Sequence, residues 1–174
     1  SDIDPVLAQA AFTATGSYPK GYIEMKMGLN VYLEGNIFQG WPTAIAIQGV
    51  NQNSDTPWVT VSDFTFRNNW VRDFGTCFII NMGNPTGAEW DINRLGENLV
   101  IENNLFTQNT TAGENKIMTA VNLGPNATIR HNTWVTRASY DGPMTSIVSG
   151  GGSVGMTIKD NIWFNSRYGW GNLA

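Results

Sequence analysis

Five charged residues recur along this chain at nearly regular intervals and are the first candidates for chemistry. They are Glu34, Arg67, Glu102, Arg130 and Lys159, and successive members lie 33, 35, 28 and 29 residues apart. Opposite charges that face each other on neighbouring strands form ion pairs, which stabilise a sheet by roughly 0.2–1 kcal/mol each. The alternative is a charged groove for an acidic sugar, in which Arg130 and Lys159 supply the positive charge. Both residues are therefore candidates for catalysis as well.

Two long connections, residues 49–59 and 81–97, contain a second group of candidates. Their notable side chains are Asp55, Trp58, Glu89, Trp90, Asp91, Arg94 and Glu97. Tryptophan offers a large apolar plane with a polar handle, and beside acids and amides it makes a common sugar-binding surface. Trp58, Trp90, Asp55 and Arg94 are thus candidates for carbohydrate binding, and Glu89 and Asp91 for catalysis. The competing interpretation is that both tryptophans only pack the connections onto the body of the protein.

Other kinds of site find less support. A hard cation needs several oxygen ligands, and no cluster of three or more acidic residues falls on neighbouring predicted strands, so we predict no metal site and no cofactor. A glycoside hydrolase needs two carboxylates about 5–10 Å apart, and Asp63 and Asp73 flank only one turn. His131, the single histidine, could act as a general base. It occupies the same turn position as Asp160, however, which favours a backbone role for both residues.

A repeated segment must position these side chains. It consists of a short strand, one pivot residue, an asparagine and a large apolar residue two places later, and it occurs five times. The asparagines are Asn36, Asn69, Asn104, Asn132 and Asn161. A repeat of about 30 residues built from strands and turns indicates a solenoid. The pivot residues are Gly35, Asn68, Asn103, His131 and Asp160, most of them types that tolerate a left-handed backbone.

The columns of the repeat predict which side chains face inward. The positions three and five before each asparagine hold only apolar residues, and the position between them faces outward, because side chains alternate along a strand. The large residues two places after the asparagines should form an inner stack: Phe38, Val71, Phe106, Trp134 and Trp163. The asparagine amides should point inward and hydrogen-bond one another as a ladder. We expect further strands over 44–47, 77–80, 117–121 and 146–148.

The column directly after the asparagines is unusual because it should face outward yet is mostly apolar. Its members are Ile37, Trp70, Leu105, Thr133 and Ile162. An outward apolar row suggests a covered face, such as a contact with a protein partner or another subunit.

This pattern resembles the right-handed parallel β-helix superfamily of pectate-lyase-like proteins over roughly residues 22–168. The stretch from IEMKMGLNVYLEGNIFQGW through TPWVTVSDFTFRNNWVRDFG is most similar to secreted bacterial β-helix repeat proteins without an assigned activity. The resemblance implies an all-β, right-handed parallel β-helix of about five to six coils and an extracellular or periplasmic, cell-surface location. Lyases of that superfamily use an Arg or Lys base with Ca²⁺ or a second cation, and the acidic cluster for Ca²⁺ is missing here.

Composition narrows the remaining possibilities. The net charge of −4 argues against nucleic acid, which needs a basic face. The sequence contains no run of about 20 apolar residues, so we predict no membrane-spanning helix. The single cysteine, Cys77, excludes an internal disulfide and should be a small core residue.

Residues 1–20 could form an N-terminal cap or lead-in to a β-helix domain over 21–174. That domain lacks an evident C-terminal cap, so we expect a longer chain or a partner at its ends.

Two functions therefore remain open. The first is a secreted module directed at polysaccharide, which binds it or, less readily, cleaves it as a polysaccharide lyase or glycoside hydrolase. The second is a non-catalytic structural or assembly subunit that covers a partner surface or contacts other subunits. An enzyme should place two carboxylates, or a carboxylate and a cation, near one substrate bond, whereas a scaffold should bury the 37/70/105/162 column.

Overall fold

The computed structural model describes residues 21–39, 43–49, 59–74, 76–82, 95–108, 116–135, 145–147, 154–163 and 170–173. Throughout these residues the regular structure is all β, without a helix. The sixteen strands form three sheets in which every pair of neighbours is parallel. This arrangement is compatible with a parallel β-helix or solenoid, as the repeat predicted.

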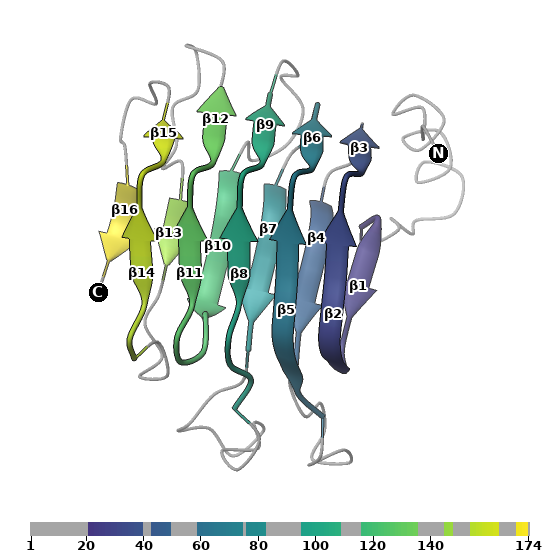
Figure 1. Cartoon of the computed structure of the whole chain (residues 1–174), viewed down its shortest axis with the longest axis vertical. Coiled ribbons are helices and arrows are strands. Elements are labelled where there is room, and N and C mark those ends of the chain that lie inside the picture. The colour runs from purple at the N-terminus through teal and green to yellow at the C-terminus, as the bar shows by residue number, and fades with distance from the viewer. Residues whose placement is uncertain are drawn as a thin grey trace.

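The chain visits the three sheets in a fixed cycle (Figure 1). Sheet A has the order β1 (Ile23–Met25), β4 (Thr43–Gln48), β7 (Thr76–Asn81), β10 (Lys116–Asn122), β13 (Thr145–Ile147) and β16 (Trp170–Leu173). Sheet B has the order β2 (Gly28–Glu34), β5 (Val61–Arg67), β8 (Val100–Glu102), β11 (Thr128–Arg130) and β14 (Thr157–Lys159). Sheet C has the order β3 (Ile37–Gln39), β6 (Trp70–Arg72), β9 (Leu105–Thr107), β12 (Thr133–Val135) and β15 (Ile162–Trp163). We call one strand of sheet B with the following strand of sheet C a rung.

A sharp bend of two residues joins sheet B to sheet C in every rung. The first residue of each bend has a left-handed backbone, with φ between 54° and 70°, at Gly35, Asn68, Asn103, His131 and Asp160. Gly, Asn and Asp adopt this conformation at low cost because their side chains are absent or short and polar. The sequence prediction that these are turn residues is therefore confirmed, including for His131 and Asp160.

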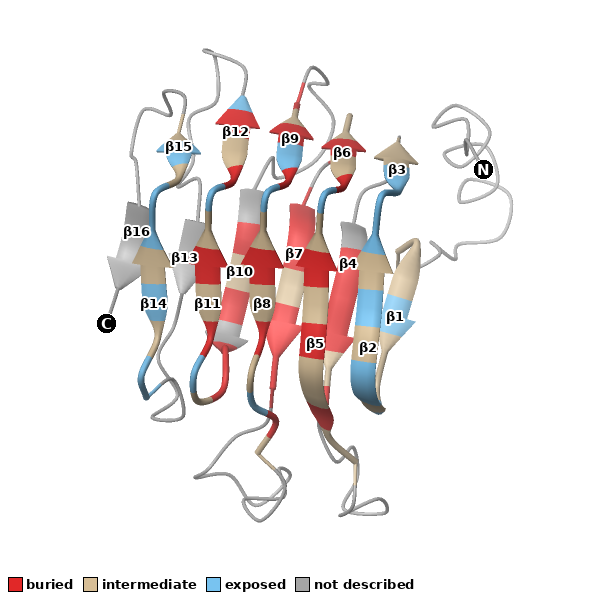
Figure 2. Ribbon diagram, viewed as in Figure 1, coloured by how far each residue is buried: buried red, intermediate tan, exposed pale blue. Residues whose placement is uncertain are grey.

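The inward columns of sheets B and C form the core with the inward residues of sheet A. Phe64, Phe66, Leu99 and Ile101 are fully buried, as are Phe78 and Ile80 of β7. The predicted inner stack is present: Phe106 and Trp134 lie 5.0 Å apart between ring centroids, and Trp134 and Trp163 lie 3.7 Å apart. Figure 2 shows burial concentrated in the central strands, with exposed positions increasing toward β2 and β14.

The asparagines of the bends form a hydrogen-bonded ladder. The side-chain oxygen Oδ1 of Asn104 accepts from both the backbone N–H (2.9 Å) and the Nδ2 amide (3.2 Å) of Asn69. The Nδ2 group of Asn104 donates in turn to the backbone oxygen of Phe66 (2.9 Å) and to Oδ1 of Asn132 (2.9 Å). Asn69, Asn104 and Asn132 are buried, whereas Asn36 is exposed on the first rung. The ladder supplies partners for amides that would otherwise be buried without a hydrogen bond.

A second column of left-handed residues was not predicted. It lies six residues before each asparagine, just before or within the strands of sheet B, and consists of Asn30, Asp63, Asn98, Asn126 and Gly155. Asn98 Nδ2 donates to Asp63 Oδ1 at 2.8 Å, and Asn126 Nδ2 donates to Asn98 Oδ1 at 3.3 Å. Its residue types were the available signal, since all five are Asn, Asp or Gly.

Some predicted boundaries need adjustment. The strands predicted over 44–47, 77–80 and 117–121 are each longer, because β4, β7 and β10 also take in flanking polar residues. Residue 148, the predicted end of the fourth strand, lies outside the described residues, as do residues 1–20. A search of the described part of the chain finds no helix with the length and apolar character to span a bilayer.

Candidate functional site

The charged residues on the outer face of sheet B partly neutralise one another. They are Glu34, Arg67, Glu102, Arg130 and Lys159. Glu34 pairs with Arg67 at 2.9 Å, and Glu102 pairs with Arg130 at 2.7 Å. Hydrogen bonds from Arg67 and then Asn68 lower the pKa of the Glu34 carboxyl, and the hydrogen bond to Glu34 raises the pKa of Arg67. Of the three neighbouring pairs of opposite charges, Arg67 and Glu102 are register partners, but no ion pair joins them, so the predicted pairing fails at this step. Each of the two arginines forms an ion pair with one glutamate, so the charged residues form two separate pairs.

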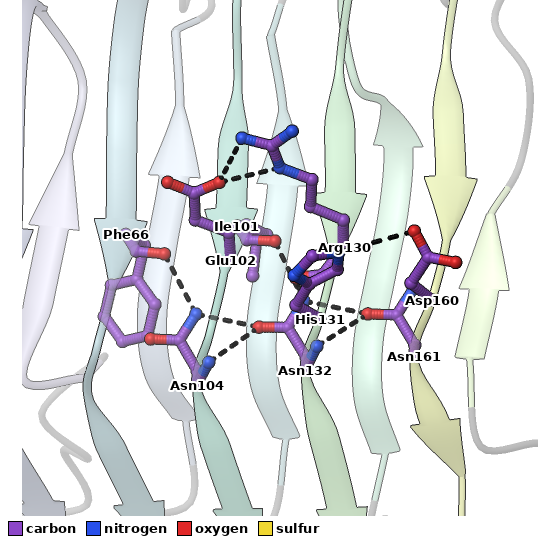
Figure 3. Close-up of polar contacts among 9 residues, drawn as sticks. All are labelled: Phe66, Ile101, Glu102, Asn104, Arg130, His131, Asn132, Asp160 and Asn161. Atoms are coloured by element: carbon purple, nitrogen blue, oxygen red, sulfur yellow. Dashed lines mark hydrogen bonds and ion pairs between the residues drawn. The ribbon is translucent and has the colours of Figure 1, made fainter.

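Arg130 and Lys159, the cationic candidates, are register partners on β11 and β14. Figure 3 shows Arg130 turned toward Glu102, with its Nε at 2.8 Å from the Glu102 Oε2. Beside them, His131 Nε2 lies 3.3 Å from Asp160 Oδ2, and both side chains are largely exposed. Lys159 forms no ion pair within the described ranges. Among the residues described, Arg130 is neutralised by Glu102 and Lys159 has no such partner.

The six candidates in the long connections, Asp55, Trp58, Glu89, Trp90, Asp91 and Arg94, lie outside the described residues. The strands that bound their connections are described. Residues 49–60 run from β4 to β5, and residues 82–99 run from β7 to β8, so both connections leave sheet A and lead to sheet B. The connections 108–115 and 136–144 enter sheet A at β10 and β13. The connection 148–156 also leaves sheet A for sheet B, so all five long connections adjoin sheet A, three at the carboxyl ends of its strands and two at the amino ends.

One row on the outer face of sheet A contains a charged, two apolar and a hydroxyl side chain, in the order Glu24, Ala46, Ile79 and Thr119. Ala46 is in register with Ile79, and Ile79 with Thr119. Their neighbours Ile45, Ile47, Phe78 and Ile80 are fully buried on the opposite side of the sheet. Ala46 is itself buried, whereas Ile79 and Thr119 are half-buried.

The outer face of sheet C contains three polar residues that were not among the sequence candidates: Gln39, Arg72 and Thr107. Arg72 lies with its guanidinium carbon 4.6 Å from the centre of the Trp70 ring. Trp70 Nε1 donates to Thr107 Oγ1 at 2.9 Å, and Gln39 Nε2 donates to Asp73 Oδ2 at 3.4 Å. The available signal was alternation, because the third residue after each asparagine must face the same way as the first. The apolar members of the predicted outward row do face solvent, since Ile37 is 59% exposed, Ile162 57% and Leu105 38%.

Two further types of chemistry find no support among the residues described. Cys77 is fully buried, and burial raises the pKa of its thiol, so the unreactive protonated form is favoured. No group of three or more His, Cys, Asp and Glu side chains lies together there in a way that could hold a metal ion.

A hollow of about 540 Å³ lies at the bend of the first rung. It is lined by Tyr22 and by Gly35, Asn36, Ile37 and Phe38. None of these side chains is charged, and none is a predicted site residue, so the hollow offers no acid, base or cation to a substrate.

Comparisons with known proteins are negative. No family model matches the chain, and searches of curated proteins and of solved structures found no match.

Proposed function

We propose that this chain is a right-handed parallel β-helix of five to six coils, of the pectate-lyase-like kind, that binds polysaccharide as a secreted bacterial module. The three parallel sheets, the buried asparagines and the aromatic stack support the architecture. An extracellular or periplasmic, cell-surface location follows from the polymer it would bind. We propose that the polysaccharide binds to the outer face of sheet A and to the long connections that adjoin it.

The observation that carries this proposal is the uneven distribution of connection lengths. The bend from sheet B to sheet C has two residues in every rung, while residues 49–60, 82–99, 108–115, 136–144 and 148–156 all adjoin sheet A. Every connection of eight or more residues therefore starts or ends at sheet A, at one end of its strands or the other, and such insertions often form the binding surface of a solenoid. Trp58, Trp90, Asp55 and Arg94 all belong to connections that leave sheet A.

Binding is favoured over cleavage by the state of the charged residues. Cleavage by acid–base chemistry needs a carboxylate pair, or a carboxylate with a cation, that is free to act on the substrate. Of the described acids on sheet B, Glu34 and Glu102 pair with arginines, and Asp63 accepts a hydrogen bond from Asn98. Glu89 and Asp91 remain the candidates for catalysis in the 82–99 connection.

The test is a comparison of polysaccharide affinity between variants. Trp58→Ala and Trp90→Ala should each weaken binding of a soluble plant or microbial polysaccharide by about tenfold, since each removes a stacking surface. Tyr32→Ala is the matched control, because Tyr32 is an exposed aromatic residue on the outer face of sheet B. Equal affinity of both tryptophan variants and the control would refute sheet A as the receptive face.

A non-catalytic assembly subunit is the second candidate function. It is favoured by the exposed apolar side chains of Ile37, Leu105 and Ile162 along sheet C. The mass of the natively isolated protein, measured by light scattering, tests this alternative. A defined complex that dissociates on Leu105→Lys substitution would support it, and a monomer would contradict it.

A further inference from the structure

The outer face of sheet C is formed by two parallel rows of side chains with different chemistry. The register places Ile37, Trp70 and Leu105 in one row and Gln39, Arg72 and Thr107 in the other. Over these three rungs the first row is apolar and the second is polar or charged, whereas on the next rung Thr133 and Val135 continue the two rows. Neighbouring residues in each row are about 4.8 Å apart, the spacing of strands in a sheet.

Trp70 is held in a defined orientation within these rows. Its indole N–H donates to Thr107 Oγ1 at 2.9 Å, which ties the ring to the next strand. The Arg72 guanidinium carbon lies 4.6 Å from the ring centre and covers one face of the indole. Trp70 remains only half-buried, on a strand whose inward residue, Val71, is fully buried.

Arg72 retains hydrogen-bonding capacity in this position. Its Nε is buried without a hydrogen-bond acceptor and is out of reach of a ligand. No hydrogen bond or ion pair to Nη1 or Nη2 occurs within the described ranges, so these two groups are the donors left for a ligand. The adjacent carboxylate, Asp73, accepts from Gln39 instead. A guanidinium that stacks on an aromatic ring keeps its N–H donors at its edge, where a carboxylate can accept two of them.

The size of this face favours a small occupant. A strand of three residues is about 10 Å long and five strands span about 20 Å, so the face covers about 200 Å². A stable protein–protein interface needs about 800 Å² from each partner. This face alone is too small for such an interface and large enough for a few sugar units.

We propose that Trp70 and Arg72 form a binding site for an acidic sugar unit of a polysaccharide. The apolar C–H face of the sugar ring packs against the free face of the indole and against Leu105, and its carboxylate pairs with Arg72. Gln39 and Asp73 lie beside the site and offer an amide and a carboxylate to the sugar hydroxyls. The site rests on the proposed function, since it adds a second contact for the same class of polymer on a different sheet.

Titration calorimetry with two short ligands tests this site. A short oligogalacturonate and the neutral oligogalactose of equal length would be titrated into wild-type protein and into Trp70→Ala, Trp70→Phe and Arg72→Gln. Arg72→Gln should weaken the acidic ligand about tenfold and leave the neutral one unchanged. Trp70→Ala should weaken both about tenfold, while Trp70→Phe should retain most of the affinity. Ile162→Ser, in the same outward row on the last rung, is the control and should bind like the wild type.

The double variant Trp58→Ala/Trp90→Ala separates this proposal from the proposed function. If only that variant loses binding, the Trp70–Arg72 site is wrong and the sheet A proposal stands. If only the Trp70 and Arg72 variants lose binding, the site is correct and sheet A is not the receptive face. Absence of binding by wild-type protein would overturn both proposals. A loss in Ile162→Ser equal to that in Trp70→Ala would mean that a larger partner contacts the whole row, and would overturn the localised site.

Discussion

Asparagine suits the bend between sheets B and C because its side chain both donates and accepts within a short reach. At Asn132, Oδ1 accepts from the backbone N–H and the Nδ2 group of Asn104, and Nδ2 donates to the backbone oxygen of Ile101 at 2.8 Å. An aspartate would lose the donor, and a serine would not present two functional atoms. The recurrence of one residue type at this corner therefore has a physical cause in hydrogen bonding.

At the residue scale, Asn104→Ala should destabilise the protein strongly. It would remove the hydrogen bonds that the Asn104 amide makes with the buried backbone N–H of Asn69 and with the carbonyl of Phe66, at about 1–3 kcal/mol for each group. We expect a loss of about 2–5 kcal/mol in the free energy of unfolding, measured by urea denaturation. Asn36→Ala, at the exposed end of the ladder, is the matched control and should cost less than about 1 kcal/mol. Equal losses in the two variants would contradict a structural role for the buried ladder.

The Glu34–Arg67 pair predicts a dependence of stability on pH. Hydrogen bonds from Arg67 and Asn68 lower the pKa of Glu34 in the folded state below its value in the unfolded chain. Glu34 therefore contributes stability above the unfolded-state pKa, about 4.3, and this contribution is lost as the pH falls through the lower folded-state value. The difference in melting temperature between wild type and Glu34→Gln should be constant from about pH 6 upward and should vanish in acid. A difference that grows on acidification would have the wrong sign.

At the element scale, the distance between neighbouring connections determines which glycines can be replaced. Gly124, between β10 and β11, has φ +71°, and a Cβ there would collide with the backbone oxygen of Gly96 in the neighbouring connection. Gly35 has nearly the same φ, +70°, but nothing lies within 4 Å of the position of its Cβ. The two glycines thus share a backbone requirement and differ in their surroundings.

This difference gives a prediction with an internal control. Gly35→Ala should cost about 1–2 kcal/mol, the cost of a left-handed backbone for a residue with a side chain. Gly124→Ala should cost more than twice as much, because the neighbouring backbone must also move. Thermal unfolding of both variants checks this. Similar losses would show that the two connections do not approach as closely as described.

At the scale of the whole molecule, the repeat made much of the fold predictable. A strand alternates its faces, so a column of large apolar residues around a fixed asparagine assigns inward and outward positions without tertiary information. Phe66, Ile101 and Trp134 are buried as that rule requires. The left-handed column at Asp63, Asn98 and Asn126 followed the same spacing and could have been found in the same way.

Other features depend on distances that sequence alone does not contain. The alternating charges predicted an ion pair at every neighbouring step, yet each guanidinium pairs with a single carboxylate, and the choice depends on side-chain reach. Gly124 and Gly96 approach each other closely, although they belong to two different connections whose lengths do not repeat along the chain. The Trp70–Arg72 contact was missed because Trp70 was interpreted only as a member of an apolar row. The six candidates in the long connections remain predictions.

Hydrogen exchange measured with and without an acidic polysaccharide tests the central claim most directly. The account predicts slower exchange in peptides that cover 49–60 and 82–99 and in strands β4, β7 and β10, because the polymer would cover the outer face of sheet A. The Trp70–Arg72 site predicts additional protection in β6 and β9. Protection confined to other segments, or binding too weak to slow exchange at all, would contradict the proposed polysaccharide-binding function.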